Sequence, residues 1–331
     1  ACKDILDGKY HDQFQVDMIQ GGAGTSTNMN ANEVIANIAL LHLGKKAGEY
    51  EFCSPHDTIN RSQSTNDAYP TAIHMGLYAS HLKFLPHLEA LIEALQKKGD
   101  EFAHIIKMGR TQLEDAVPMT LGQTFYGFAS ILRNEIKHLN EAAADFLVVN
   151  MGSTAIGTGI CSEPGYAEKT IEALKEITGW EVSLADDWVG ATSDTSCMVG
   201  YMSALKRVAV KINKICNDLR LLASGPRCGF GEINLPARQP GSSIMPGKVN
   251  PTQCEAMTMI AAQVLGNDVA INIGGATGHF ELNVFKPMMI YNFLHSARLI
   301  GDVCVSFNDK CAIGIEPIRE NIQKNLENSL M

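Results

Sequence analysis

Residues 241–251 read Gly241-Ser242-Ser243-Ile244-Met245-Pro246-Gly247-Lys248-Val249-Asn250-Pro251. This segment, called the signature loop below, places two hydroxyls, one cation and one carboxamide on a backbone that glycine frees and proline stiffens. Hydroxyl and amide groups can bind carboxylate oxygens, and Lys248 can balance negative charge that develops in a reaction. The same residue types are also typical of an ordinary surface turn. The residues of this segment therefore leave two interpretations open, an anion-binding loop and a plain turn.

The composition is that of an ordinary globular protein, because 45% of the 331 residues are hydrophobic and 19% are charged. A chain of this length can form one large core or two smaller ones. The formal net charge of −9 and the lack of any run of Lys or Arg argue against a nucleic-acid partner. The same net charge would repel a dianionic substrate, so such a substrate would need a local pocket of donors.

The nine cysteines are scattered, with no Cys-x-x-Cys pair and no spacing suited to zinc. Cys197, Cys216 and Cys254 lie in apolar helical patterns, where buried free thiols are expected. We therefore predict no metal site, no cofactor and a cytoplasmic location. Neither end reads as a signal peptide, and no apolar run reads as long enough to cross a membrane, so no membrane partner is expected.

Apolar residues recur at helical spacing along most of the chain, which predicts a mainly α fold. Helices are expected over about 27–43, 66–106, 118–146, 194–223, from 252 to 267 or beyond, and 287–305. Pro70 and Pro118 suit first helical turns, whereas Pro86 is expected to kink or break its helix. Several helices are apolar on more than one face, which predicts a bundle that continues into neighbouring copies of the chain. The best strand candidate is 180–182.

Three further polar segments stand apart from the helical patterns: Gly21–Asn28, Asn60–Asp67 and Gly109–Pro118. The first two lie just before helices, where unpaired amides and the helix dipole favour an anion. The third is expected to be a loop between two helices. Ordinary helix caps and solvated turns explain each of these segments equally well when it is taken alone.

Together and in this order, the four segments resemble the corresponding segments of the fumarase/aspartase superfamily, whose members eliminate water or an amine from a C4 dicarboxylate to give fumarate. The resemblance covers essentially the whole chain. It implies a long-helix bundle of the fumarase/aspartase type with a dominant central domain. It also implies a homotetramer in which each active site is assembled from three subunits and binds a small dicarboxylate.

The resemblance further implies a division into domains. Residues 1–60 would be the remainder of an N-terminal domain, 61–310 the central helical bundle with the signature loop at 241–251, and 311–331 the start of a C-terminal domain. Members of the family carry further sequence on both sides. The chain is therefore expected to be a central piece whose terminal domains are incomplete.

Roles for single residues follow from the same resemblance. Ser242 would be the catalytic base that takes a proton from the carbon beside the β-carboxylate, and Lys248 would be the second catalytic residue. The expected substrate-binding residues are Thr25, Ser64, Thr65, Asn66, Thr111, Gln112, Ser243 and Asn250, with Glu255 in support. Because serine is a poor base, Ser242 would need positive charge and amide donors around it.

These residues would divide between the two ends of the substrate. Lys248, Asn250 and Thr111 would hold the α-carboxylate, and Asn66 would lie near the leaving group. The hydroxyls of Thr25, Ser64, Thr65 and Ser243 would surround the other carboxylate, which becomes a doubly charged aci-carboxylate after proton loss.

Gln112 distinguishes the two main branches of the family. Fumarases have a histidine at its place, oriented by the carboxylate that Glu255 matches. A glutamine cannot shuttle a proton, and ammonia needs less acid help because it leaves from an already protonated ammonium. The segments up to the signature loop resemble aspartases, whereas 252–256 and 280–285 after it resemble fumarases.

We therefore predict the reversible anti-elimination of ammonia from L-aspartate to give fumarate. Hydration of fumarate to L-malate is the alternative within the same chemistry, and elimination from argininosuccinate or adenylosuccinate fits the quoted segments less well. A helical scaffold that has lost catalysis is the alternative from another class.

Overall fold

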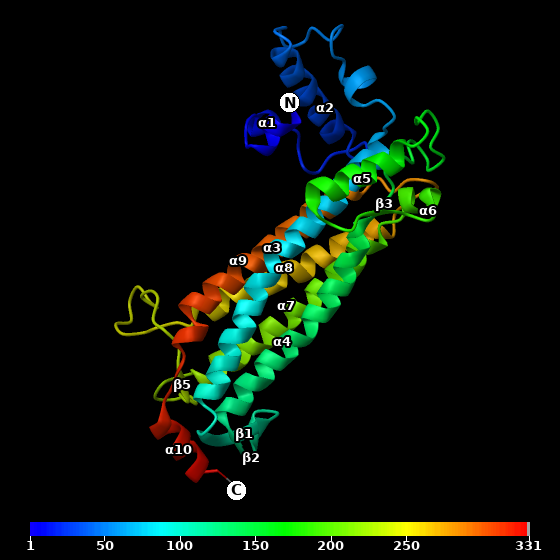
Figure 1. Ribbon diagram of the computed structural model, residues 1–331. Helices are drawn as coiled ribbons and strands as arrows, with labels where there is room; N and C mark the ends of the chain where they lie inside the picture. The colour runs from blue at the N-terminus through cyan, green and yellow to red at the C-terminus, as the bar shows by residue number, and fades with distance from the viewer. Residues whose placement is uncertain (330–331) are drawn as a thin grey trace. The chain divides into compact units, whose positions relative to one another are not determined.

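The computed structural model describes residues 1–329 and is mainly helical, which confirms the predicted fold class. Its α-helices are α1 (Cys2–Leu6), α2 (Thr25–His42), α3 (Thr65–Glu101), α4 (Leu121–Ala144), α5 (Tyr166–Thr178), α6 (Trp188–Ser193), α7 (Ser196–Leu222), α8 (Thr252–Gly275), α9 (Lys286–Lys310) and α10 (Arg319–Glu327). The strands are short: β1 (Ile106–Thr111), β2 (Glu114–Thr120), β3 (Val148–Val149), β4 (Ser183–Leu184), β5 (Ile233–Asn234) and β6 (Glu316–Pro317). Figure 1 labels most of these elements.

The chain forms two compact units that interleave along the sequence. The first unit consists of Ala1–Ala79, Ala142–Tyr201 and Val269–Leu294. The second consists of Ser80–Glu141, Met202–Asp268 and the residues from His295 onward. The five long helices α3, α4, α7, α8 and α9 each contribute residues to both units. The division into 1–60, 61–310 and 311–331 stays a prediction, and residues 330–331 of its last part lie outside the described residues.

In the second unit the five long helices lie side by side (Figure 1). Polar contacts join neighbours: Arg133 in α4 donates to Gln96 in α3 at 3.2 Å, Lys206 in α7 pairs with Asp268 in α8 at 2.7 Å, and Ser306 in α9 donates to Gln253 in α8 at 3.0 Å. The core between them is apolar and aromatic, with Phe102 and Phe125 packed edge to face. This bundle carries the β1–β2 hairpin and the signature loop at helix ends.

In the first unit a buried aromatic cluster joins three elements. Phe146, Tyr201 and Phe293 have ring centroids 4.9 to 5.7 Å apart, and each side chain is fully buried. Helix α2 forms a smaller core with η2 (Pro55–Ile59), in which Ala36 and Leu40 are inaccessible to solvent. The first unit also contains the N-termini of α2 and α3, where the first two polar segments lie.

Several expectations about local structure were wrong. Residues 109–118 form most of an antiparallel hairpin and not a loop between helices, so Pro118 lies in β2 opposite Met108 and does not open α4. Strand β2 can accommodate Pro118 because it pairs with β1 alone, so its other edge is open, and because the register shifts next to this pair, between Met108 and Arg110.

Pro86 does not break α3, which runs from Thr65 to Glu101, and the expected kink at Pro86 stays a prediction. The buried side chains of Phe84 and Leu88 on either side anchor the flanking turns, and this burial outweighs the one backbone hydrogen bond that proline removes. Pro70 lies in the second turn of α3. The strand expected at 180–182 begins at Ser183 instead and pairs with β3 in parallel.

Helix α8 is the one helix among residues 1–329 whose length and composition would let it cross a membrane. Its mean hydropathy over an 18-residue window is 1.2, and 33% of that window is buried. A single helix of this kind is weak evidence for a membrane span, because core helices of soluble proteins have the same composition. The described cysteines are all free thiols, with Cys216 and Cys254 buried and Cys197 partly buried.

Candidate active site

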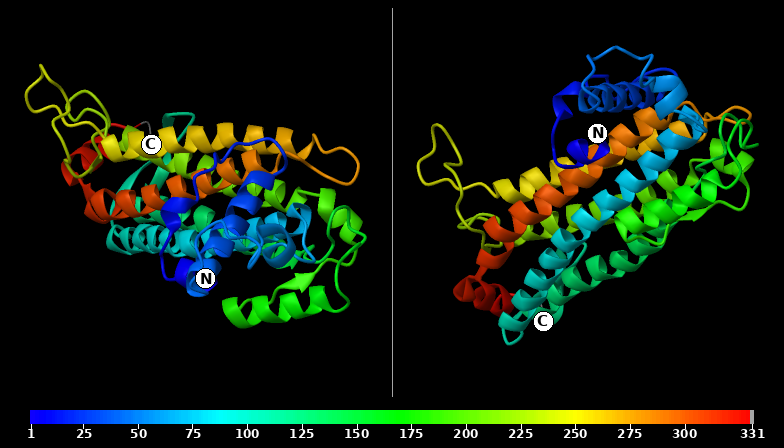
Figure 2. Two further views of the ribbon diagram at one scale, coloured as in Figure 1. Left: turned by 90° about the horizontal axis from the view of Figure 1, so that it is seen from above. Right: turned by 45° about the horizontal axis from the view of Figure 1, so that its top comes forward.

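The signature loop is closed at its neck by two hydrogen bonds. The Gly241 amide donates to the Lys248 carbonyl at 2.9 Å, and Asn250 Nδ2 donates to the Gly241 carbonyl at 2.8 Å. A Cβ on residue 241 would lie 2.4 Å from the Lys248 oxygen, so glycine is needed there. Between these contacts the loop projects away from the first turn of α8 and is mostly exposed (yellow in Figure 2).

Ser242 occupies a position that suits the predicted base. Its Oγ accepts hydrogen bonds from the backbone amides of Ile244 at 3.2 Å and Met245 at 3.0 Å. Amides that point at a hydroxyl oxygen stabilise its deprotonated form. The turn of the loop thus supplies the amide donors that a serine base requires.

A pocket of about 790 Å³ lies at the base of the loop. It is lined by the C-terminal part of the loop, including Lys248 and Asn250, and by Arg220, Arg238 and Glu316. Three cations and one carboxylate make this a locally positive hollow in a chain of net negative charge. Arg220 was not predicted, because it lies outside the segments that carry the family resemblance.

Glu255 lies in the first turn of α8 and is half-buried. Its side chain has no hydrogen bond or ion pair within residues 1–329, although its backbone amide donates to the Pro251 carbonyl. The histidine that such a carboxylate would orient is replaced by Gln112. The structure therefore leaves Glu255 as an open acceptor beside the signature loop.

The turn of the β1–β2 hairpin carries Thr111 and Gln112. Gln112 and Leu113 have φ values of 55° and 67°. These values lie in the left-handed region, which residues other than glycine, asparagine and aspartate seldom adopt. Thr111 pairs with Glu114 at the last position before this turn, and its side chain is exposed. A strained turn of this kind persists only where its surroundings hold it.

In the first unit the start of α3 is held by a reciprocal cap. Ser64 Oγ accepts from the Asn66 amide at 3.1 Å, while Asp67 Oδ1 accepts from the Ser64 amide at 2.9 Å. The second oxygen of Asp67 accepts from the amides of Gly152 at 3.2 Å and Thr154 at 2.8 Å. Burial raises the pKa of Asp67, and the amide hydrogen bonds act in the opposite direction.

Asp67 therefore ties the 152–154 segment to the polar segment before α3. This role was not predicted, because the partners of Asp67 lie about 85 positions away along the chain. Ser64 does cap α3, as one of the two interpretations predicted. Its oxygen accepts in this cap, so the hydroxyl proton of Ser64 remains available for a further partner.

Asn66 is oriented by the neighbouring segment. Its Nδ2 donates to the Ala155 carbonyl at 2.8 Å, and its own carbonyl accepts from Asn150 Nδ2 at 3.0 Å. Because a carbonyl only accepts, the Asn66 amide must turn its nitrogen to Ala155, which leaves Oδ1 without a partner in the described part of the chain. The free oxygen can accept a hydrogen bond from an amine.

Thr25 begins α2, and the same unit brings it toward the start of α3. A Cβ on Gly24 would lie 2.2 Å from the ring of Tyr69, so these helix ends touch. Asn28 Nδ2 also donates to Thr65 Oγ1 at 3.3 Å. The first unit thus gathers the predicted residues Thr25, Ser64, Thr65 and Asn66.

The second unit holds Thr111, Gln112, Ser242, Ser243, Lys248, Asn250 and Glu255. Neither unit, taken by itself, contains the whole predicted set. Among residues 1–329 no group of three or more His, Cys, Asp or Glu side chains is arranged to hold a metal ion.

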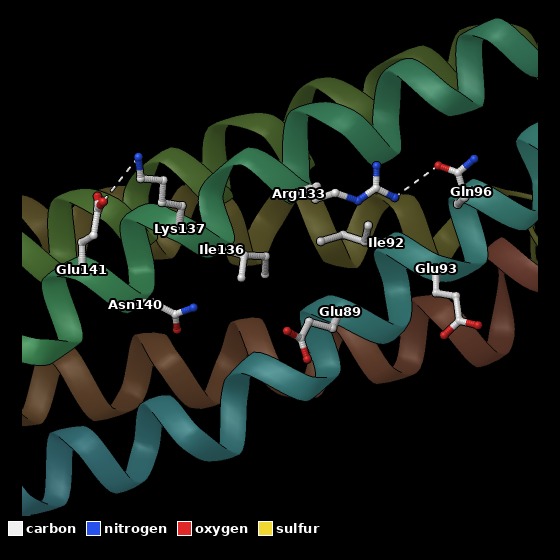
Figure 3. A pocket seen from close by; sticks show the side chains of 9 residues that line it. All are labelled: Glu89, Ile92, Glu93, Gln96, Arg133, Ile136, Lys137, Asn140 and Glu141. Carbon is white, nitrogen blue, oxygen red and sulfur yellow. Dashed lines mark hydrogen bonds and ion pairs between the residues drawn. The ribbon is translucent and has the colours of Figure 1, made fainter. Parts of the chain in front are cut away.

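A further pocket of about 720 Å³ lies between α3 and α4 in the second unit and is shown in Figure 3. Its polar groups largely satisfy one another: Arg133 donates to Gln96 at 3.2 Å, and Lys137 pairs with Glu141 at 3.6 Å. It contains none of the predicted site residues. We therefore place the candidate active site elsewhere.

Comparison with known proteins shows the family. The sequence profile of the family described as Lyase matches residues 1–266. An aspartate ammonia-lyase of Pseudomonas aeruginosa is 51% identical over 331 residues, which are 100% of this chain and 70% of that protein. A class II fumarate hydratase of Neisseria meningitidis is 50% identical over 332 residues, covering 100% of this chain and 72% of that one.

Solved structures agree with these sequence matches. The crystal structure titled fumarate lyase:delta crystallin from Brucella melitensis bound to cobalt superposes with a TM-score of 0.97 at 51% identity, covering 99% of this chain and 71% of that one. A class II fumarase from Schistosoma mansoni superposes with a TM-score of 0.95 at 35% identity, covering 100% and 72%. The relatives of both kinds are lyases, and the chain belongs to the fumarase/aspartase superfamily.

Proposed function

We propose that the chain catalyses the reversible anti-elimination of ammonia from L-aspartate to give fumarate. Overall similarity does not decide this, because relatives named for each activity are about equally identical. The observation that carries the proposal is the pair of groups expected at the leaving group. Gln112 cannot donate and retrieve a proton for water chemistry, and Asn66 presents a free amide oxygen that can accept from the substrate ammonium.

Ser242 is the base in this mechanism. The amides of Ile244 and Met245 favour its deprotonated oxygen, which removes the proton from the carbon beside the β-carboxylate. The electron pair moves into that carboxylate and gives an aci-carboxylate with two negative charges. The hydroxyls of Thr25, Ser64, Thr65 and Ser243 donate to it. Collapse of this intermediate expels ammonia from the neighbouring carbon and leaves fumarate.

Lys248, Asn250 and Thr111 bind the α-carboxylate at the other end of the substrate. The positive hollow at the base of the signature loop supports this assignment, because it offers local cations in a chain of net charge −9. Orienting both carboxylates places the reacting carbon against Ser242, which is how a bound geometry lowers a barrier.

The active unit in this proposal is a homotetramer in the cytoplasm, with each site assembled from three chains. One observation supports it. Helix α8 exposes large apolar side chains, with Met259 70% exposed and Ile273 59% exposed, and such a surface is typically covered by another subunit.

The test is the absorbance of fumarate formed from L-aspartate and, in parallel, from L-malate. Fumarate from aspartate alone is the expected result. Fumarate from malate alone would contradict the proposal and favour the fumarate hydratase alternative, which the open carboxylate of Glu255 supports. If a folded tetramer forms fumarate from neither substrate, the chain is a helical core without a complete active site.

A further inference from the structure

Glu232 lies in the segment between α7 and the signature loop, and it is completely buried. Arg110 Nη2 donates to its Oε1 at 2.7 Å, and Lys107 Nζ lies 3.4 Å from its Oε2. Both cations come from β1 of the hairpin. The Arg110 guanidinium also stacks over the Phe230 ring, 4.3 Å from its centroid. Arg110 therefore contacts two side chains, Phe230 and Glu232, of the segment between α7 and the signature loop.

The backbone of Glu232 is fixed as firmly as its side chain. Its amide donates to the Leu222 carbonyl at the end of α7, and its carbonyl accepts from the Ile318 amide before α10, both at 2.8 Å. Asn325 in α10 adds a hydrogen bond from Nδ2 to Oε1 at 3.2 Å. Glu232 therefore joins the end of α7, β1 and α10, all within the second unit.

The hairpin turn needs such an anchor. Gln112 and Leu113 are both in the left-handed region, and Arg110 immediately precedes Thr111. A pocket of about 590 Å³ borders the turn and is lined by Gln112, Leu113 and side chains of α4 and α7. Packing is thus incomplete on one side of the turn, and Leu113 is 63% exposed. The charged contacts to Glu232 must supply the constraint that packing does not.

We propose that Glu232 is a positioning residue, which holds the strained turn that carries Thr111 and Gln112 and links it to the segment leading into the signature loop. The claim about catalysis rests on the proposed function, whereas the claim about the turn does not. A charged hydrogen bond between buried groups fixes geometry more tightly than a neutral one, so loss of the carboxylate charge releases the turn.

The chain offers a matched control in Glu135. This glutamate of α4 is also completely buried in the second unit and is also bound by one arginine and one lysine, Arg207 and Lys211 of α7. These ion pairs join α4 to α7 and involve no residue of the hairpin. Loss of charge at Glu135 therefore imposes a similar penalty on a buried ion pair without touching the turn.

The experiment compares E232Q with E135Q in the full-length assembled protein. We expect both to lower the melting temperature, and only E232Q to lower kcat/KM for L-aspartate, by about tenfold or more, because misplaced binding groups raise the barrier. Hydrogen exchange of peptides covering 106–120 should accelerate in E232Q alone. Exchange in the middle of α4 should accelerate in E135Q alone.

Equal losses of activity in the two variants, or unchanged exchange of the hairpin in E232Q, would overturn the proposal. Should E232Q not fold, R110K provides the same comparison, because lysine keeps the charge but loses the planar fork of the guanidinium. A wild-type protein silent with both substrates would refute the proposed function. The exchange measurement would still test the position of Glu232.

Discussion

In the proposed function, Gln112 is the residue that distinguishes ammonia elimination from water elimination. Q112H places an imidazole at the hairpin turn, in the compact unit that also contains the unpartnered carboxylate of Glu255. We expect kcat/KM for L-malate to rise by about tenfold or more and that for L-aspartate to fall, because an imidazole can donate a proton to a leaving hydroxide. Fumarate formation from both substrates measures the change.

Q112N serves as the control for this prediction, since it alters the side chain without adding a titratable group. A rise in malate activity in Q112N equal to that in Q112H would show that shape and not proton transfer matters. An unchanged ratio of the two activities in Q112H would contradict the assignment of Gln112.

We expect the stability of the first unit to depend on pH through Lys286. The side chain is 2% exposed and donates to the Thr192 carbonyl at 2.8 Å, and burial lowers its pKa to about 8 against the opposing attraction of Cys197 and Asp194. Its unfolded pKa is 10.5. The unfolded chain therefore binds more protons between these values, so stability rises with pH in that window by about 3 kcal/mol.

K286M removes this contribution, so the variant should lack the rise in the free energy of unfolding between about pH 8 and pH 10.5. Urea titrations at several pH values, in wild type and K286M, check the slope. An identical pH dependence in the two proteins would show that Lys286 does not titrate in this range.

At the scale of elements, the neck of the signature loop decides its conformation. G241A places a Cβ against the Lys248 oxygen, whereas G247A meets no atom within 4 Å and only strains a residue at φ 76°. We expect G241A to lower kcat by about a hundredfold or more by opening the neck, and G247A to lower it far less. Melting temperatures of both should stay close to wild type, because the loop is exposed.

Steady-state kinetics with L-aspartate and thermal melts measure these two effects. Equal losses of activity in G241A and G247A would mean that backbone freedom throughout the loop, and not closure at its neck, is what matters.

The elements that the sequence predicted well are those whose signal is local. Helices α2, α7 and α9 follow from apolar spacing because each buries one stripe against the core. The β1–β2 hairpin was missed, because Gln112 and Leu113 are not turn-forming residues and the conformation is imposed from outside. The contact of Arg110 with Glu232 spans 122 positions, so no pattern within either segment could reveal it.

The site residues show the same limit. Ser242 and Lys248 were predicted because the signature loop is a contiguous string with a family resemblance. The amides that support Ser242 and the carbonyl that turns Asn66 are backbone groups, which carry no sequence signal at all. Side-chain roles can be transferred along a motif, whereas orientation comes from the fold.

At the scale of the whole molecule, shared sites predict complementation between inactive variants. N66A removes a group of the first unit and S242A one of the second, so each variant alone should be inactive. If one chain supplies Asn66 and another supplies Ser242 to each site, about a quarter of the sites in randomly mixed tetramers contain both wild-type groups. Refolding an equal mixture should therefore restore about a quarter of the wild-type activity.

A mixture of S242A with K248A is the matched control, because both groups belong to one loop of one chain. Every chain in that mixture carries a substitution in its signature loop, so every site receives a defective loop. The mixture should therefore remain inactive. If the control mixture also regains activity, then the recovery in the N66A and S242A mixture does not show that sites are shared between chains. No recovery from the N66A and S242A mixture, in tetramers shown to contain both chains, would mean that each site is built from a single chain.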